Sequence, residues 1–301
     1  MAADLPMLKG PLVFDRALLR RRLARAHALG FETFLIDRVA ADLAERLGAV
    51  LRRFDLAVDL GTPTGAVREA LADNSAIGTL IAAAALAHAT PAVVADEEAL
   101  PFREGALDLL VSALALQFVN DLPGTLVQIR RALKPDGLFL AAMLGGDTLT
   151  ELRQSFAAAE AEIEGGISPH VAPFVDVREM GALLQRAGLA LPVTDVERLT
   201  VRYSSPFRLM GELRRMGATN ALTERRRKPL RRATLHRMAE IYARRFADPD
   251  GKIRATFEII WLSGWAPHES QQKPLRPGSA QARLADALGT REVGAGEKAG
   301  E

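Results

Sequence analysis

The sequence contains no cysteine among its 301 residues. Disulfides, thiolate metal ligands and cysteine nucleophiles are therefore excluded. Aromatic residues make up only 5% of the chain and do not alternate with its basic runs, so we expect no nucleic-acid binding. The longest apolar region, Leu107–Val119, is interrupted by polar residues and is too short for a transmembrane span of roughly 20 residues. What remains, 49% hydrophobic and 25% charged, is typical of a globular protein.

The formal net charge is only +2, but the basic residues are clustered. One cluster is Arg20–Arg22, and the other comprises Arg225, Arg226, Arg227, Lys228, Arg231 and Arg232. Two interpretations remain open: solvated helix faces, or a docking surface for an acidic protein partner or a membrane surface. The bias towards Ala, Arg and Leu indicates a bacterial gene. We therefore expect a cytoplasmic protein, with peripheral contact at the inner membrane as the alternative.

Short apolar segments alternate with helical periodicity over the first half of the chain. Helices are predicted at 14–51, 67–71 and 122–133, and strands at 56–60, 79–86, 93–94, 107–112 and 138–144. A turn at 134–137 precedes the last of these strands. This alternation predicts an α/β fold with a doubly wound, Rossmann-like parallel sheet and helices on both faces. In such sheets ligands bind at the carboxyl ends of the strands.

The pattern changes after residue 144. Helices are predicted at 148–164, 174–187, 207–216 and 234–245, and two antiparallel strands at 193–203 and 255–265. The predicted organisation is an N-terminal extension (1–13), one domain (14–280) whose substrate side is elaborated over about 145–280, and a disordered Gly/Ala/Glu-rich tail (281–301).

Two segments at strand ends are candidates for a ligand site. The turn Asp59–Gly65 (DLGTPTG) follows the first strand, and its glycines would let a ligand approach the backbone. Asp96 and Glu97 follow the third strand, where acids suit an adenine amino group or a ribose hydroxyl. For each segment the alternative is a tight turn or capped loop without a ligand.

These segments occur in a familiar order. DLGxxxG, ADEExLPF, SxLxLQxVNDLP and LKPDGxF together resemble the class I S-adenosylmethionine-dependent methyltransferases. The resemblance implies a seven-stranded, mostly parallel sheet and S-adenosylmethionine as cofactor. It implies that the first turn holds the methionine end and that the later acids hold the adenosine. The cofactor-binding residues implied are Asp59, Gly61, Thr62, Gly65, Asp96, Glu97 and Leu114.

Further motifs resemble one subgroup, that of mitochondrial complex I assembly factor 5, described for the family as an arginine hydroxylase acting on a complex I subunit. They are Phe14-Asp15-Arg16, the block Gly145–Leu149, Glu151-Leu152-Arg153, Glu164-Gly165-Gly166, Ser168-Pro169-His170, Pro173-Phe174 and the block His268–Gln271. The similarity runs from about residue 14 to 280. A related group, the malonyl-carrier-protein methyltransferases of biotin synthesis, shares the first half of the pattern.

Two positions depart from the methyltransferase pattern. Pro63 replaces the middle glycine of the first turn, and proline has no N–H and a bulky ring. Ala84 occupies the position of the acid that accepts both ribose hydroxyls. Losing a charge-assisted hydrogen bond of about 1.5–3 kcal/mol weakens binding roughly 10- to 150-fold. We therefore expect S-adenosylmethionine binding to be weakened or lost.

The candidate catalytic residues are Asp147, Glu151, His170 and His268. Asp147 follows the last parallel strand, and Glu151 lies four residues further on, so the two carboxylates would hold a substrate guanidinium from one helix face. Alternatively, Asp147 caps that helix. The histidines lack the spacing of a metal site, and we expect no metal.

Three functions stay open at this point. The first is modification of an arginine of a complex I subunit, a protein partner, during assembly. The second is S-adenosylmethionine-dependent methyl transfer to a small molecule or carrier protein. The third is a non-catalytic assembly chaperone that has lost its cofactor.

Overall fold

The computed structural model describes residues 12–86, 92–272, 286 and 289–291. The chain divides into two compact units, Met1–Pro267 and His268–Glu301, and the fold described below is that of the first. The predicted extension (1–13) and tail (281–301) lie almost entirely outside the described residues.

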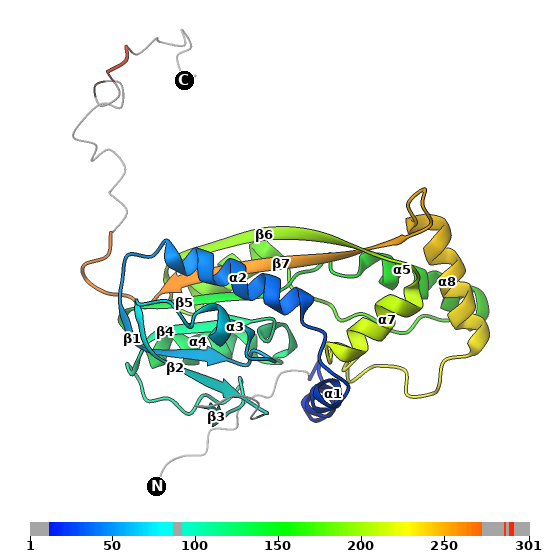
Figure 1. The fold of residues 1–301 in the computed structure, drawn as a ribbon, viewed down its shortest axis with the longest axis horizontal. Helices are drawn as coiled ribbons and strands as arrows, with labels where there is room; N and C mark the ends of the chain where they lie inside the picture. The colour runs from blue at the N-terminus through cyan, green and yellow to red at the C-terminus, as the bar shows by residue number, and fades with distance from the viewer. Residues whose placement is uncertain (1–11, 87–91, 273–285, 287–288, 292–301) are drawn as a thin grey trace, which may run out of the picture. The chain divides into compact units, whose positions relative to one another are not determined.

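A single seven-stranded sheet forms the centre of the first unit (Figure 1). Its strands, in chain order, are β1 (Phe54–Leu60), β2 (Ile77–Ala84), β3 (Ala92–Val94), β4 (Leu107–Ala113), β5 (Leu133–Leu144), β6 (Ala190–Tyr203) and β7 (Ile253–Trp265). The spatial order is β3-β2-β1-β4-β5-β7-β6. Five strands run parallel from β3 to β5, and β7 pairs antiparallel with both β5 and β6. The predicted Rossmann-like α/β class and the antiparallel late strands are confirmed.

Helices cover both faces of this sheet (Figure 1). They are α1 (Arg16–Ala28), α2 (Phe34–Gly48), α3 (Ala66–Ala70), α4 (Leu122–Ala132), α5 (Thr150–Ile163), α6 (Val177–Arg186), α7 (Pro206–Arg215) and α8 (Arg232–Phe246), with one 3₁₀ turn at Leu116–Phe118. Two apolar cores result, because neighbouring residues of each strand point to opposite faces. Ala57 and Leu109 join the core beneath α2 and α3, whereas Val58 and Leu110 join the core beneath α4 and α6.

The prediction of one helix over 14–51 is wrong. The structure contains two helices, α1 and α2, with Leu29–Thr33 between them. Gly30 adopts φ +81°, a left-handed conformation that ends a helix and that glycine reaches without strain. The break matters because it lets α1 leave the sheet face that α2 covers.

The residues of the predicted turn at 134–137 form part of β5, which begins at Leu133. The pairing with β4 shifts register between Leu107 and Leu109, and Asp136 adopts φ +65°. The Pro-Asp-Gly segment is thus an irregularity within the strand rather than a separate turn.

The strand order reverses between β1 and β4, since β2 lies on one side of β1 and β4 on the other. The connections after these two strands leave in opposite directions and open a crevice at their carboxyl ends. The sheet topology therefore places the ligand site where the chain continues from Leu60 and Ala113.

Candidate functional site

The turn after β1 is fastened by the carboxyl group of Asp59. The Thr62 hydroxyl donates to Asp59 Oδ1 and accepts from the backbone N–H of Ala113, at 3.1 Å. This chain of bonds ties the end of β1 to the end of β4. Asp59 is buried, and burial raises its pKa to about 7, against the lowering effect of the Thr62 hydroxyl.

Gly61 requires glycine for two reasons. Its φ is +74°, and a Cβ at this position would lie 2.8 Å from both Ala115 Cβ and Glu97 Oε1. The backbone of Gly61 therefore lies directly against the segments that follow β3 and β4. Gly65, also predicted to bind cofactor, is the N-cap of the short helix α3 and has an ordinary φ of −78°.

The segment after β4 carries an unpartnered polar atom. Leu114 adopts φ +53°, an uncommon conformation for leucine that is typical of strained functional sites. The Gln117 side chain donates to the Leu114 carbonyl at 2.7 Å. The residue is only 6% exposed, and its Oε1 is buried with no hydrogen-bond partner among the residues that the structure describes. A buried acceptor of this kind is available to a ligand donor.

Asp96 and Glu97 do bind cationic groups, and these belong to the chain itself. Arg16 of α1 pairs with Asp96 Oδ1 at 2.7 Å and also with Glu97, and Arg20 pairs with Asp96 Oδ2. Despite the burial that opposes it, the Glu98 backbone N–H and the two arginines lower the pKa of Asp96. A ligand that binds these acids must therefore share them with α1.

The segment that begins α1, Phe14-Asp15-Arg16, is held by hydrogen bonds at the same edge of the sheet. Phe14 donates its backbone N–H to Asn120 Oδ1 at 2.7 Å and accepts from Asn120 Nδ2 at 3.2 Å. It also forms an isolated β-bridge with Leu222, in the loop after α7. The Asp15 carboxylate caps α1 by accepting from Leu18 N–H at 2.9 Å. The Phe14-Asp15-Arg16 motif thus fixes the position of α1.

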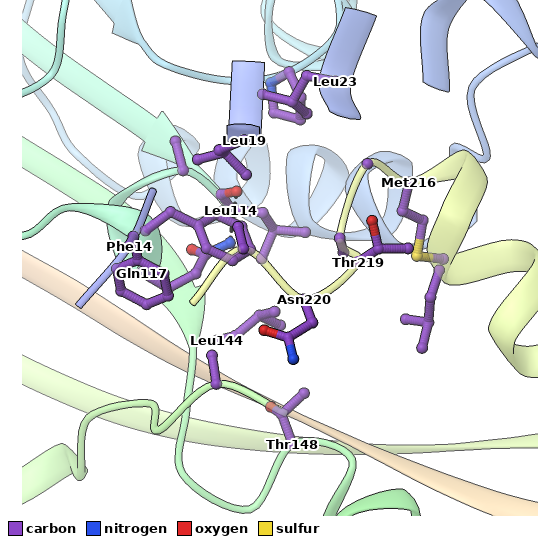
Figure 2. A pocket seen from close by; sticks show the side chains of 18 of the residues that line it. Phe14, Leu19, Leu23, Leu114, Gln117, Leu144, Thr148, Met216, Thr219 and Asn220 are labelled. Carbon is purple, nitrogen blue, oxygen red and sulfur yellow. Dashed lines mark hydrogen bonds between the residues drawn. The ribbon is translucent and has the colours of Figure 1, made fainter. Parts of the chain in front are cut away.

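These elements enclose a cavity of about 280 Å³, which we call the main cavity. Its walls come from the turn after β1, the segments after β4 and β5, helix α1 and the loop after α7 (Figure 2). Figure 2 shows Phe14 and Gln117 together on one side and Thr219 and Asn220 on another, with Leu144 and Thr148 from the end of β5. Of the predicted cofactor residues, Gly61, Glu97 and Leu114 line it directly.

Of the two departures from the methyltransferase pattern, one lies in the lining of this cavity and the other directly precedes a lining residue. Pro63 is part of its lining. At the end of β2 the lining residue is Ala85, one position after Ala84, which ends the strand. Neither alanine can accept a hydrogen bond through its side chain. The edge of β2 therefore offers no carboxylate to a ribose.

Asp147 and Glu151 lie outside the lining of the main cavity. Helix α5 begins at Thr150, so Asp147 precedes it, and the predicted pairing of both acids on one helix face is wrong. Asp147 is half exposed and binds Arg198 of β6, which also pairs with Glu258 at 3.1 Å. Asp147 does not cap α5, whose N-cap residue is Leu149.

Glu151 is buried and serves the packing of α5 on β7. Its carboxylate accepts from the Thr256 hydroxyl at 2.6 Å and from the Thr256 N–H at 3.1 Å. Both oxygens are thus engaged. The assignment of these two acids to a substrate guanidinium stays a prediction.

His170 lines the main cavity and is held by a carboxylate that the motifs did not single out. Its Nε2 lies 2.9 Å from Oε1 of Glu160, which is almost completely buried in α5. Ser168 donates to Glu160 through both its backbone N–H and its hydroxyl, each at 2.7 Å. His170 also stacks on Phe156, with ring centroids 3.9 Å apart. The imidazole is therefore held in a fixed orientation.

His268 belongs to the second unit, where its Nδ1 lies 2.7 Å from the Ser270 hydroxyl. Within the described ranges, no group of three or more His, Asp or Glu side chains could hold a metal ion.

Three site residues escaped prediction: Arg16, Glu160 and Asn220. Arg16 stands in the Phe14-Asp15-Arg16 motif, but its partners are about 80 residues away in the sequence. Glu160 occurs in an acidic helix end where burial is not evident from the sequence. Asn220 donates to the Pro169 carbonyl at 2.6 Å and so joins the loop after α7 to the Ser-Pro-His segment.

With this geometry in view, the class of the protein follows from comparison with known families. The family model of the methyltransferase domain matches residues 58–141, which run from β1 into β5. Two solved structures share the fold at low sequence identity. A Bacillus halodurans protein assigned to the methyltransferases has a TM-score of 0.50 at 14% identity, covering 76% of this chain and 99% of its own. The YcgJ protein of Bacillus subtilis has a TM-score of 0.52 at 15% identity, covering 77% and 99%.

Similarity over nearly the whole chain defines the family within that class. The "Arginine-hydroxylase NDUFAF5, mitochondrial" of Danio rerio is 39% identical over 92% of this chain and 90% of its own length. The Homo sapiens protein of the same name is 41% identical over 89% and 81%. The chain belongs to the NDUFAF5 family. It is also similar to a "Malonyl-[acyl-carrier protein] O-methyltransferase" of Xylella fastidiosa, 33% identical over 85% of this chain and 89% of that protein.

Proposed function

We propose that this chain hydroxylates an arginine side chain of a protein partner and acts in the assembly of respiratory complex I. The family supplies the reaction class, because its mammalian and fish members are named arginine-hydroxylases. The observation that carries the proposal for this chain is that residues of the subgroup motifs meet at one cavity. Phe14, Arg16, Thr148, His170 and Phe174, from four separate motif segments, all line it.

We propose further that the main cavity binds S-adenosylmethionine. Gly61 presents bare backbone to the cavity, and Gln117 leaves a buried acceptor without a partner. Both features fit a ligand with an amino group at the end of the parallel strands. Pro63 and the missing acid of β2 make the fit weaker than in methyltransferases that have these groups. When bound, the cofactor would bring an electrophilic methyl group on its sulfonium, which suits methyl transfer. Hydroxylation would in addition consume molecular oxygen and a two-electron reductant, with one oxygen atom entering the arginine side chain and the other leaving as water.

Methyl transfer is the second candidate function. It is favoured by the relative of Xylella fastidiosa, whose name is that of an O-methyltransferase acting on the malonyl carrier protein. The NDUFAF5 relatives are more similar and support the first candidate.

Of the predicted catalytic residues, we propose that Asp147, which directly precedes Thr148 of the main-cavity lining, holds the guanidinium of a substrate arginine that enters this cavity. It already binds one guanidinium, that of Arg198, and this ion pair is half exposed. Exposed ion pairs contribute only about 0–1 kcal/mol, so a substrate arginine could displace Arg198 at little expense. Glu151 instead positions α5 against β7 through Thr256. His170, oriented by Glu160, is one of the groups in the cavity wall that can accept a proton, together with the carboxylates of Glu32 and Glu97. We also propose a catalytic role for His268.

No helix within the described residues is long and apolar enough to cross a membrane. We propose that the chain acts in the bacterial cytoplasm, with the inner-membrane surface as the alternative. Complex I subunits are the proposed partners.

The experiment compares complex I purified from a bacterium with and without this gene. Peptide mass spectrometry should find one arginine that gains an oxygen atom only when the gene is present. Asp147→Ala should restore complex formation with the partner but leave that arginine unmodified, because the guanidinium clamp is gone. The matched control is Asp250→Ala, which removes another exposed carboxylate that binds an arginine of β6, Arg202. It should restore the modification fully.

Two results would overturn the proposal. Equal oxygen content with and without the gene would exclude hydroxylation and leave the non-catalytic chaperone. A methyl group in place of the oxygen atom would establish the second candidate.

A further inference from the structure

A second cavity of about 250 Å³ adjoins the main cavity, and we call it the basic hollow. His170 and Asn220 line both cavities, so the two are neighbours along one wall. The remaining polar lining of the basic hollow is cationic: Arg22 from α1, and Arg225, Arg226 and Lys228 from the loop between α7 and α8.

Among the residues that the structure describes, only two of these four charges are neutralised by carboxylates. Arg225 pairs with Asp15 at 3.3 Å, and Arg226 pairs with Glu164 at 3.2 Å. Arg22 and Lys228 form no ion pair with any described residue. Two positive charges that lack a carboxylate therefore face one concave space.

Arg22 also carries a buried donor with no acceptor. Its Nη1 is inaccessible to solvent and has no hydrogen-bond partner among the described residues. Burial, with the nearby charges of Arg225 and Arg25, lowers the pKa of Arg22, although Asp15 opposes the shift. Burying an unpartnered donor beside like charges is unfavourable unless an anion joins them.

We propose that the basic hollow binds a carboxylate group of an acidic segment in the protein substrate, next to the arginine that enters the main cavity. This proposal rests on the proposed function. An extended peptide advances about 3.3 Å per residue, so neighbouring side chains can reach two adjoining cavities. Guanidinium groups match carboxylates in geometry and charge.

The shape of the site favours a peptide over a membrane. The hollow is concave and its lining includes one apolar side chain, Leu230. A surface that docks on lipid presents apolar residues beside its basic ones. One interpretation of the sequence was that these cations face solvent from a helix. In the structure, Arg22, Arg225, Arg226 and Lys228 line one concave space.

The test measures binding of a fluorescent peptide, an arginine flanked by glutamates, to the full chain by anisotropy at low ionic strength. A second peptide has glutamines in place of the glutamates, and a third has alanine in place of the arginine. The acidic peptides should bind at least tenfold more tightly than the glutamine peptide. Arg22→Gln and Lys228→Gln should each weaken the acidic peptides by about tenfold.

Arg21→Gln is the matched control, because Arg21 is an exposed neighbour on the same helix and does not line the hollow. It should bind all peptides as the unmodified chain does. Lys228→Gln lies in a loop, so its effect is readable even if Arg22→Gln fails to fold.

Three outcomes would overturn the proposal: equal binding of the glutamate and glutamine peptides, equal weakening by Arg21→Gln, or inorganic phosphate that binds as tightly as the peptide and displaces it fully. The last would assign the hollow to a free phosphate group. The alanine peptide separates this proposal from the proposed function, because it reports on the anion site without any arginine to modify.

Discussion

Asp59 is a carboxyl group that the fold keeps away from water. It lies at the end of β1, and the Thr62 hydroxyl that binds it also binds the end of β4. Burial raises its pKa to about 7, well above the roughly 3.9 of an aspartate in the unfolded chain. The folded protein therefore holds a proton, between about pH 4 and about pH 7, that the unfolded chain releases.

This proton predicts how stability changes with pH. Because folded Asp59 holds a proton in that window, the contribution of Asp59 to the free energy of unfolding falls as pH rises from about 4 to about 7 and then levels off. Asp59→Asn keeps a hydrogen-bond acceptor for Thr62 and cannot ionise. Urea unfolding at about pH 5 and about pH 8 should show a smaller fall for Asp59→Asn than for the unmodified chain. The same fall in both proteins would contradict a buried, proton-binding Asp59.

The position of a site residue could be predicted from the sequence where it depends only on the end of a single strand. Asp59 lies near the end of β1, Gly61 follows that strand directly and Glu97 follows β3, and topology brings such positions to one edge. Asp147 was placed correctly after β5, but its neighbour Arg198 comes from β6, and sequence spacing does not reveal that partner. Glu160 was missed because it contributes to the site by binding the His170 imidazole, and His170 lies ten residues later in the chain, across a turn.

Helix α1 is the element that closes the main cavity. Arg16 anchors it through Asp96 and Glu97, and the Arg16 side chain is only 14% exposed. Gly217, with φ +71°, lets the loop after α7 approach Leu23 of the same helix closely. The helix is thus held at its first turn by charge and along its side by packing.

Arg16→Met should loosen this helix. The substitution keeps an unbranched side chain but removes the charged partner of two carboxylates. We expect a loss of about 1–3 kcal/mol in the free energy of unfolding and faster amide exchange in α1, with α4 unchanged. Arg21→Met is the control, since Arg21 is exposed on the same helix, and its exchange should match the unmodified chain. Unaltered exchange in α1 of Arg16→Met would show that packing alone holds the helix.

Elements were predictable where hydrophobic periodicity was strong and local. β4, α4, β6 and β7 begin within three residues of their predicted starts. The single helix predicted over 14–51 failed because apolar spacing continues across Gly30, where the backbone turns left-handed. Periodicity shows which residues are buried, and does not show that α1 packs away from the sheet while α2 packs on it.

Three parts of the chain contribute residues to one edge of the sheet: the matched methyltransferase domain, the part before it and the part after it. The matched methyltransferase domain ends in β5, at residue 141, and supplies the turn after β1 and the acids after β3. The later part, with α5 to α8, supplies His170 and Asn220, and α1 comes from the part before the domain. One cavity is therefore lined both by residues of the matched methyltransferase domain and by residues from outside it.

The most direct test of this arrangement is calorimetric titration of the full chain with S-adenosylmethionine, alongside two glycine variants. Gly61→Ala puts a methyl group 2.8 Å from Ala115 Cβ, whereas Gly105→Ala meets no atom within 4 Å, and both glycines have left-handed φ. We predict saturable binding to the unmodified chain and to Gly105→Ala, with Kd below about 1 mM, and none to Gly61→Ala. Absence of heat from the unmodified chain at millimolar ligand, or equal binding by both variants, would contradict a cofactor site in the main cavity.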